Sequence, residues 1–420
     1  PKICILYGIF LLYKFKFVIK YRKHYYCRFC RFIRKGDCYM KKFARIAACT
    51  MAAMMVFAPV VANAEDNSIS ACIITTTGVD DGSFNTNVYE GMTQFAEKYP
   101  DSTITDVKQE DLTKCLQTVE DLVGDYDVLV LPGFEFAAIG DIAEANPEKD
   151  FILVDTTATY SDGTALNGPL DNIYSMTFKE QEGGFFAGVA AALSTETGKV
   201  AVVNGIAYPS NVNYQFGFMA GVNYANAKYG TAAEYVELPS YSGMAAVPVE
   251  ALAVDGNDGT DVGGNYIGDF GDQAKGKEVG KALIDAGCDV IFVAAGGAGN
   301  GVFTAMKEAG TGYIIGCDVD QYEDGENGDS NIILTSALKI MDKNVCEQLT
   351  KIHDGSFKGE DALLGADTDS TGYVAQDGHQ QLSKEALEKL TECFAAVKDG
   401  TVVPPSNFNG GTPTDFPGLK

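Results

Sequence analysis

The stretch SACIITTTGVDDGSFNTNVYEGMTQF, residues 70–95, contains a change of hydrophobic period that decides the fold class. It opens with a short apolar run rich in β-branched residues, which is typical of a buried strand. From Phe84 onward apolar residues recur every three or four positions, at Val88, Met92 and Phe95, which predicts one face of a helix. The polar segment between these two patterns therefore predicts a loop that leads from the end of a strand to the start of a helix.

The same alternation recurs along the rest of the chain. A first series of short apolar runs and amphipathic stretches extends to FILVDTTA at residues 151–158, and a second begins with GKVAVVNG near Gly198. This alternation is typical of parallel sheets covered by helices on both faces. Because the chain is longer than one hydrophobic core usually serves, we expect an α/β fold with two doubly wound parallel-sheet lobes.

The first 64 residues have the composition of a targeting segment. MKKFARIAACTMAAMMVFAPVVANA, residues 40–64, has a basic start, an apolar stretch and a small-x-small ending, which predicts a cleaved secretory signal peptide. We expect residues 1–39, which are basic and aromatic, to be leader sequence outside the working protein. An alternative is a lipoprotein anchored through Cys49, although most of the apolar stretch follows that residue. The predicted location is extracytoplasmic, either secreted, periplasmic or at the cell surface.

The remaining chain is strongly acidic. Residues 65–420 carry 19 Lys and Arg against 56 Asp and Glu, a formal charge of −37. Such a surface repels nucleic acid and anionic lipid, so neither is an expected partner, and membrane contact is expected only through a transporter or a lipid anchor. A neutral or cationic ligand is favoured.

Motifs for catalysis, metals and cofactors are weak in this sequence. The predicted mature chain has only two histidines, His353 and His379, and lacks the G-x-S-x-G and H-E-x-x-H patterns. The glycines of VAAGGAGNGV do not match the dinucleotide fingerprint G-x-G-x-x-G, and the acidic loops do not have the spacing of a calcium loop. We therefore predict no cofactor and no metal site, and an enzyme is disfavoured.

The candidate site lies in the loops that follow the apolar runs, because ligands of open parallel sheets bind beyond the carboxyl ends of the strands. Asp80, Asp81 and Ser83 precede the first predicted helix, where such residues commonly cap free N–H groups, and Phe84 suits the core by position alone. Those structural roles remain open. However, two adjacent carboxylates followed by Asn85 exceed what capping needs, and they suit the hydroxyl or amine donors of a ligand.

Three later loops occupy equivalent positions in the second series. VAAGGAGNGV offers glycines that let a ligand approach the backbone closely. IIGCDVDQ places Asp318 at the end of a strand, and ILTSALK places Lys339 at the end of another. A Lys and an Asp that face one cleft would form a charged clamp for a polar ligand.

Six motifs, in this order along the chain, closely resemble the basic membrane protein family, which includes the bacterial purine nucleoside receptors. They are DDGSFN, TFKEQEGGFFAGVAAA, YIGDFGDQAKGKE, AAGGAGNGVFTAMKEAG, GCDVDQ and LTSALK, and the resemblance covers about Ser68–Val402. It implies a type I-like periplasmic-binding-protein fold with three hinge crossovers, near residues 175–180, 319–322 and 371. On that basis we expect lobe 1 to comprise residues 65–177 plus 320–370, and lobe 2 residues 178–319 plus 371–420.

The resemblance also implies a function. Family members are extracytoplasmic solute-binding proteins that deliver a small molecule to the permease of an ABC importer, and the ligand is often a purine nucleoside. Two Phe side chains are expected to stack on the base, and an acid and a lysine to hold the ribose hydroxyls. The ligand-binding residues that the resemblance implies are Asp81, Phe84, Asn85, Asp155, Glu182, Phe270, Gly297, Asp318 and Lys339.

Two other functions remain open on the sequence. A binding protein for a sugar or a furanone signal would also use aromatic surfaces and aspartates. A nucleoside-processing enzyme would use clustered aspartates near a ribose, but no nucleophile motif supports it. A nucleotide is disfavoured as a ligand, because its phosphate would meet several carboxylates and a single Lys.

Overall fold

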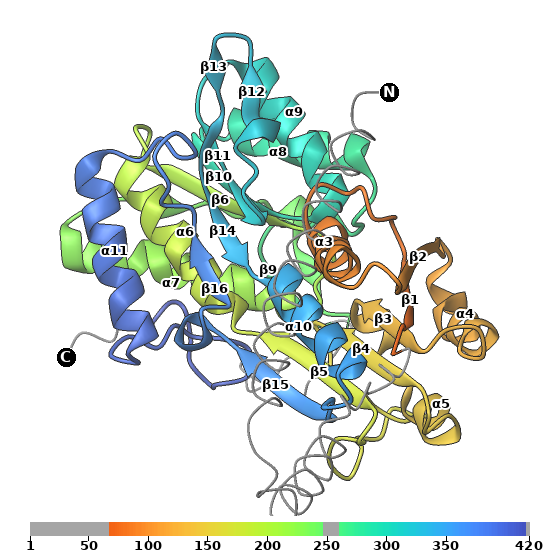
Figure 1. Ribbon diagram of the computed structural model, residues 1–420. Helices are drawn as coiled ribbons and strands as arrows, with labels where there is room; N and C mark the ends of the chain where they lie inside the picture. The colour runs from red at the N-terminus through yellow and green to blue at the C-terminus, as the bar shows by residue number, and fades with distance from the viewer. Residues whose placement is uncertain (1–66, 247–259, 417–420) are drawn as a thin grey trace, which may run out of the picture. The chain divides into compact units, whose positions relative to one another are not determined.

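A computed structural model describes residues 67–246 and 260–416 of the chain (Figure 1). The predicted leader, the predicted signal peptide and most of the acidic insert at residues 253–264 lie outside these ranges. The described residues form two six-stranded sheets and two small two-stranded sheets.

The first sheet consists of parallel strands in the order β15-β5-β4-β3-β1-β2. We call this sheet and the helices on it the first lobe. Its strands are β1 (Ser70–Thr75), β2 (Thr103–Lys108), β3 (Val128–Pro132), β4 (Asp150–Val154), β5 (Ile173–Phe178) and β15 (Glu360–Leu364). Its helices are α3 (Phe84–Lys98), α4 (Cys115–Leu122), α5 (Gly140–Ala145) and α10 (Met341–His353), with the 3₁₀ turns η1 (Leu112–Lys114) and η2 (Phe134–Phe136).

The second sheet has the order β16-β14-β11-β10-β6-β7, and all neighbours are parallel except β16, which is antiparallel to β14. With its helices it forms the second lobe. Its strands are β6 (Lys199–Asn204), β7 (Glu234–Tyr235), β10 (Val290–Ala294), β11 (Tyr313–Asp318), β14 (Ile333–Lys339) and β16 (Thr371–Tyr373). Its helices are α6 (Glu180–Ser194), α7 (Pro209–Tyr229), α8 (Gln273–Asp285), α9 (Gly299–Ala309) and α11 (Lys384–Lys398).

Short elements complete the described residues. Two antiparallel pairs are β8 (Gly243–Met244) with β9 (Asp261–Gly263), and β12 (Glu326–Asn327) with β13 (Ser330–Asn331). The remaining 3₁₀ turns are η3 (Pro239–Tyr241), η5 (Gly296–Ala298), η6 (Glu323–Gly325) and η7 (Ala366–Thr368).

The predicted fold class is confirmed, and the opening stretch behaves as its pattern indicates. β1 is buried along nearly its whole length, and Val88, Met92 and Phe95 of α3 are fully buried in the core of the first lobe. Separate apolar clusters lie on the two faces of each sheet. Burial on both faces explains why the strands read as continuous apolar runs rather than alternating ones.

The helix pair α6 and α7 packs unusually closely. A Cβ added to Gly188 of α6 would lie 2.1 Å from the carbonyl oxygen of Phe218, and one added to Gly221 of α7 would lie 2.3 Å from that of Phe185. Gly184 and Gly217 make equally close approaches one turn earlier in each helix. The glycines of the GGFFAG segment therefore let two helix backbones touch.

Residues 320–339 differ from the expected division of the chain. We expected the chain to return to the first lobe near residues 319–322, but β14 pairs in parallel with β11 and belongs to the second sheet. The chain crosses between the lobes after Phe178, after Lys339 and between Leu364 and Thr371. The physical reason is burial: Ile333 and Leu334 join second-lobe clusters, whereas the apolar face of the next helix, α10, packs on the first sheet (Figure 1).

In the described part of the chain, no helix combines the length and apolar character that a membrane span requires.

Candidate ligand-binding site

A cavity lies where the carboxyl ends of strands from both sheets meet, the place that open parallel sheets use for ligands. The empty space between its lining residues, which includes open solvent, is about 680 Å³. Seven of the nine predicted site residues line it: Asp81, Phe84, Asn85, Asp155, Phe270, Asp318 and Lys339.

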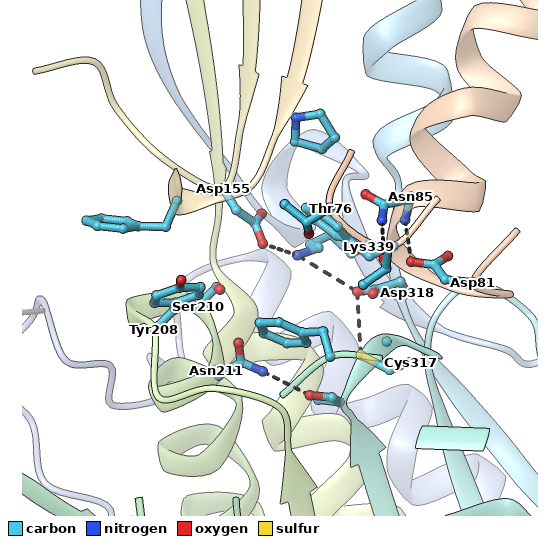
Figure 2. Close-up of a pocket in the computed structure, with 18 of the residues that line it drawn as sticks. Thr76, Asp81, Asn85, Asp155, Tyr208, Ser210, Asn211, Cys317, Asp318 and Lys339 are labelled. Atoms are coloured by element: carbon cyan, nitrogen blue, oxygen red, sulfur yellow. Dashed lines mark hydrogen bonds and ion pairs between the residues drawn. The ribbon is translucent and has the colours of Figure 1, made fainter. Parts of the chain in front are cut away.

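A chain of charges crosses the cavity. Figure 2 shows Lys339 between Asp155 at the end of β4 and Asp318 at the end of β11. Lys339 Nζ lies 2.6 Å from Asp155 Oδ2 and 3.8 Å from Asp318 Oδ1, so it links carboxylates of the two lobes. Burial works against the charged lysine, but the two carboxylates outweigh it and raise the pKa of Lys339, which keeps the ammonium charged.

The Lys339 ammonium is also enclosed by aromatic rings. It lies 4.7 Å from the ring centroid of Phe84, 5.6 Å from that of Phe178 and 5.7 Å from that of Tyr214. Such distances allow cation–π attraction, which is strongest when water is excluded, and Lys339 is only 2% exposed. The side chain is therefore fixed in position rather than free to swing.

The two aspartates that flank Lys339 share a rare backbone conformation. Asp155 has a φ of 64° and Asp318 a φ of 69°, in the left-handed region that residues other than glycine seldom adopt. Strain of this kind costs roughly 1–3 kcal/mol per residue and is concentrated at functional sites. It turns the chain at the last residue of β11 and directly after β4, where the carboxylates line the cavity.

Asp155 and Asp318 differ in how far the protein satisfies them. Asp318 Oδ1 accepts a hydrogen bond from the Tyr214 hydroxyl at 3.0 Å, and Oδ2 accepts one from Ser83 at 3.0 Å. Asp155 Oδ1 is buried and has no hydrogen-bond partner among the residues that the structure describes. Since buried polar atoms are normally paired, this oxygen is a strong candidate to accept from a ligand.

The opening loop both caps α3 and lines the cavity. The carboxylate of Asp81 accepts from the backbone N–H groups of Ser83, Asn85 and Thr86 and from the Thr86 hydroxyl. Capping, which the sequence left open, is thus a real role of Asp81, although burial still raises its pKa. The Asn85 amide donates to Thr77 at 2.8 Å, and both residues line the cavity.

The two phenylalanines come from different lobes. Phe84 is partly buried and packs against the core cluster of the first lobe while it also lines the cavity. Phe270 lies against the backbone of Gly205 in the second lobe, where an added Cβ would meet its ring at 2.2 Å. Each ring therefore packs against its own lobe, and both rings line the same cavity.

Two predicted site residues are not among those that line the cavity. Glu182 is directed to the hinge, where its Oε2 accepts from the Ala366 N–H and the Thr371 hydroxyl. Gly297 lies one residue beyond Gly296, which does line the cavity. Glu180, not Glu182, is the acid of this helix that interacts with the charges of Asp155 and Lys339, and burial raises its pKa to about 8.

The sequence reasoning missed several residues of the cavity wall. They belong to the loops after β3 and β6 and to α7: Phe134, Glu135, Tyr208, Ser210, Asn211 and Tyr214. The rule that singled out the other loops applies equally to LPGFEF and NGIAYPSN, since each follows a buried strand. The first five lie in these two segments and thus had a usable signal. Tyr214 lies inside α7 and had none.

Among residues 67–246 and 260–416, no group of three His, Cys, Asp or Glu is arranged to hold a metal ion. The polar atoms of the cavity suit hydrogen bonding to a neutral organic molecule.

Comparison with known proteins places the chain in a family. The family model described as ABC transporter substrate-binding protein PnrA-like matches residues 69–240 and 253–395. The CD4+ T-cell-stimulating antigen of Listeria innocua is 30% identical over 355 residues, covering 80% of this chain and 87% of that protein. The ABC transporter nucleoside-binding protein BmpA of Lactococcus lactis is 27% identical over 363 residues, covering 80% and 89%.

The solved structures agree on the fold. A solute-binding protein of an ABC transporter system from Aeropyrum pernix K1 superposes with a TM-score of 0.64 at 23% identity, covering 80% of this chain and 94% of that one. With a family model that spans most of the chain, and with the two-lobed fold and interlobe cavity in place, this chain belongs to the basic membrane protein family of PnrA-like, non-enzymatic substrate-binding proteins of ABC transporters.

Proposed function

We propose that this solute-binding protein takes a purine nucleoside into the cavity between its lobes and presents it to the permease of an ABC importer. The observation that carries the proposal is the Asp155–Lys339–Asp318 chain, which sets fixed acceptors and one donor beside aromatic rings of both lobes. The name of the Lactococcus relative, a nucleoside-binding protein, supports the same ligand class.

The ribose fits the charged end of the cavity. A carboxylate offers about four acceptor positions, and the protein uses only some of those of Asp318, so a 2′,3′-diol can still donate to it. Lys339 Nζ donates to Asp155 and has further N–H groups for a ribose oxygen. Asp155 Oδ1, which lacks a partner in the described residues, accepts another ligand donor.

The base fits between aromatic surfaces. Phe84 and Phe270 come from opposite lobes, and each is supported by its own lobe. A planar ring held between them gains roughly 0.5–1.5 kcal/mol per aromatic pair beyond the burial of its area. Asn85 and Thr77 lie at the same wall, where they can read polar atoms of the base edge.

Nucleotides are poor candidates for this cavity. Lys339 is the only cationic side chain among the described residues that line it, and it already faces Asp155 and Asp318. A phosphate would add negative charge without a free partner.

The test is a ligand panel on the chain from residue 65 to 420. Thermal shift and calorimetry would compare adenosine, guanosine and inosine with adenine, AMP, the sugar ribose and a furanone. We expect the purine nucleosides to stabilise the protein by about 2.7 kcal/mol at a concentration roughly 100 times Kd, and the others to have little effect. Binding of the sugar or the furanone without any nucleoside would overturn the proposal in favour of that class.

A further inference from the structure

Glu135 is a carboxylate of the cavity wall that the ribose and stacking assignments above do not use. It lies in η2, in the loop after β3, and is partly buried while it lines the cavity. Among the residues that the structure describes, its hydrogen-bond donors are its own backbone N–H and the hydroxyl of Thr76, and no Lys, Arg or His neutralises it. Its position therefore differs from that of Asp318, which has Lys339 and two hydroxyl donors.

The backbone makes specific room for this carboxylate. Gly133, which precedes η2, has φ 121° and ψ 154°, a conformation that is essentially confined to glycine. A Cβ on Gly133 would lie 2.5 Å from Glu135 Oε2 and 2.8 Å from Oε1, so the carboxylate is folded back over the glycine Cα. A position that only glycine can occupy, beside an acid without a cationic partner at the cavity wall, indicates a recognition role.

Flat aromatic surfaces adjoin the acid. The ring of Phe134, the residue before it, lies 5.5 Å from the ring of Tyr208, and that ring lies 6.1 Å from Phe270. The interplanar angles are 31° and 30°, so the three rings form a row of tilted pairs across the two lobes. A flat ligand ring stacked on such surfaces presents its exocyclic groups at its edge, and an amino group there is a donor that a carboxylate accepts.

We propose that Glu135 is a specificity-determining residue that accepts a hydrogen bond from an exocyclic amino group of the bound purine. This inference rests on the proposed function and adds that amino-substituted nucleosides bind more tightly than their analogues without that group. The 6-amino group of adenosine and the 2-amino group of guanosine share the required chemistry. A partly buried carboxylate without a cationic partner favours such a donor over the carbonyl oxygen of an oxopurine.

The experiment uses two matched ligand pairs: adenosine against purine riboside, and guanosine against inosine. On the parent protein, the amino member of at least one pair should bind roughly ten- to a hundred-fold more tightly, as a charge-assisted hydrogen bond predicts. Glu135→Gln should reduce that ratio to about threefold or less and leave the affinity for the analogue nearly unchanged. Glu135→Asp, which withdraws the charge by one methylene, should also reduce the ratio. Glu110→Gln, at an exposed acid paired with Lys108, is the control and should change nothing.

The outcomes separate the two proposals. If no purine nucleoside binds the parent protein, the proposed function fails. If nucleosides bind but neither pair differs, or if the preference survives in both Glu135 variants, the role of Glu135 is wrong and the nucleoside function stands. A loss of all affinity in both variants, with melting temperatures unchanged, would also overturn the inference, because it would make Glu135 a general rather than a selective contact.

Discussion

At the scale of single residues, the site depends on two aspartates that end strands in different sheets. Asp155 and Asp318 both adopt left-handed backbone and both approach Lys339. No local sequence pattern can relate the two residues, because 163 positions separate them. They meet because each lobe contributes the carboxyl end of a central strand to the same cavity. The clamp around Lys339 is therefore a property of two lobes, and one residue change tests it.

The first prediction concerns Asp318. If its carboxylate accepts the ribose hydroxyls, Asp318→Asn should weaken nucleoside binding by about 1.5–3 kcal/mol, or roughly ten- to a hundred-fold, in calorimetry. A 2′,3′-dideoxynucleoside should lose a similar amount on the parent protein and little more on the variant. Asp320→Asn, at the exposed acid two residues later, is the matched control. Additive losses from the variant and the ligand change would show that Asp318 and the diol are not in contact.

The second prediction concerns the pH dependence of stability. Glu180 is buried at the first crossover and accepts a hydrogen bond from Asn213; burial and the nearby Asp155 raise its pKa to about 8, although Lys339 acts in the opposite direction. The ordinary pKa of a glutamate is near 4.5, so between about pH 4.5 and 8 the folded protein binds more protons here than the unfolded chain. The contribution of Glu180 to the free energy of unfolding should therefore fall as the pH rises, by up to about 1.4 kcal/mol per pH unit.

Urea denaturation of the parent protein and of Glu180→Gln at pH 5, 6.5 and 8 would measure that contribution. Gln keeps the shape and an acceptor for Asn213 but does not titrate, so the free energy of the variant should fall less with pH. Parallel pH profiles for the two proteins would mean that Glu180 stays ionised in the folded state.

At the scale of elements, one short motif packs two helices together and binds a turn of the hinge, and the sequence analysis predicted neither role. TFKEQEGGFFAG was identified as a motif near the ligand, and Glu182 was assigned to the site. In the structure its glycines hold α6 against α7, and Glu182 binds the turn at η7 in the hinge. Helical periodicity predicts which face is buried, but not whether the neighbour is a helix or a ligand.

The third prediction tests this helix contact. Gly188→Ala should destabilise the protein by about 1–3 kcal/mol, because the new Cβ would lie 2.1 Å from the Phe218 carbonyl oxygen. That sign is informative, since Gly→Ala inside a helix otherwise gains roughly 1 kcal/mol in propensity. Gly124→Ala, at a glycine with no atom near its added Cβ, is the control and should leave stability equal or slightly higher. Thermal denaturation that ranks the variants the other way would disprove the close packing.

At the scale of the whole molecule, the fold class was predictable but the membership of one strand was not. The alternation of apolar runs and amphipathic stretches is a local signal, and it specified two lobes correctly. β14 was assigned to the first lobe because the family resemblance implied a crossover near residues 319–322. Its local pattern could not correct that assignment, since a strand followed by a helix has the same pattern whichever sheet it joins. Its pairing with β11 is decided by burial between distant segments, which no local pattern contains.

The same difference between local signals and contacts of distant segments explains which residues of the candidate site the sequence predicted. Seven of the predicted residues line the cavity, because the strand-end rule and the family resemblance both indicate segments at the ends of strands, which a local sequence pattern reveals. Phe134 and Tyr208 lie in loops that the rule also covers, but the quoted motifs did not include them. Tyr214 lies within a helix, and only the meeting of two lobes reveals that its hydroxyl reaches Asp318.

The contacts between the lobes suggest how the protein captures its ligand. Ser83 of the first lobe donates to Asp318 of the second, and the Gln321 side chain of the second donates to the Gly82 carbonyl of the first at 3.1 Å. With the Lys339–Asp155 pair, these bonds close the lobes around the cavity. Each is a polar contact worth only about 0.5–1.5 kcal/mol, or more where a charge takes part, so the closed state needs further support.

The last prediction is that a bound ligand supplies this support. A nucleoside that contacts both lobes binds the closed state better than the open one, and it shifts the population by that difference in affinity. Small-angle X-ray scattering should therefore give a smaller radius of gyration with a saturating nucleoside than without it, and Ser83→Ala with Gln321→Ala should enlarge the unliganded value further. An unchanged scattering curve with a ligand whose binding calorimetry has confirmed would show that the lobes do not open. In that case ligand entry would have to occur through the part of the cavity that is open to solvent, without hinge motion.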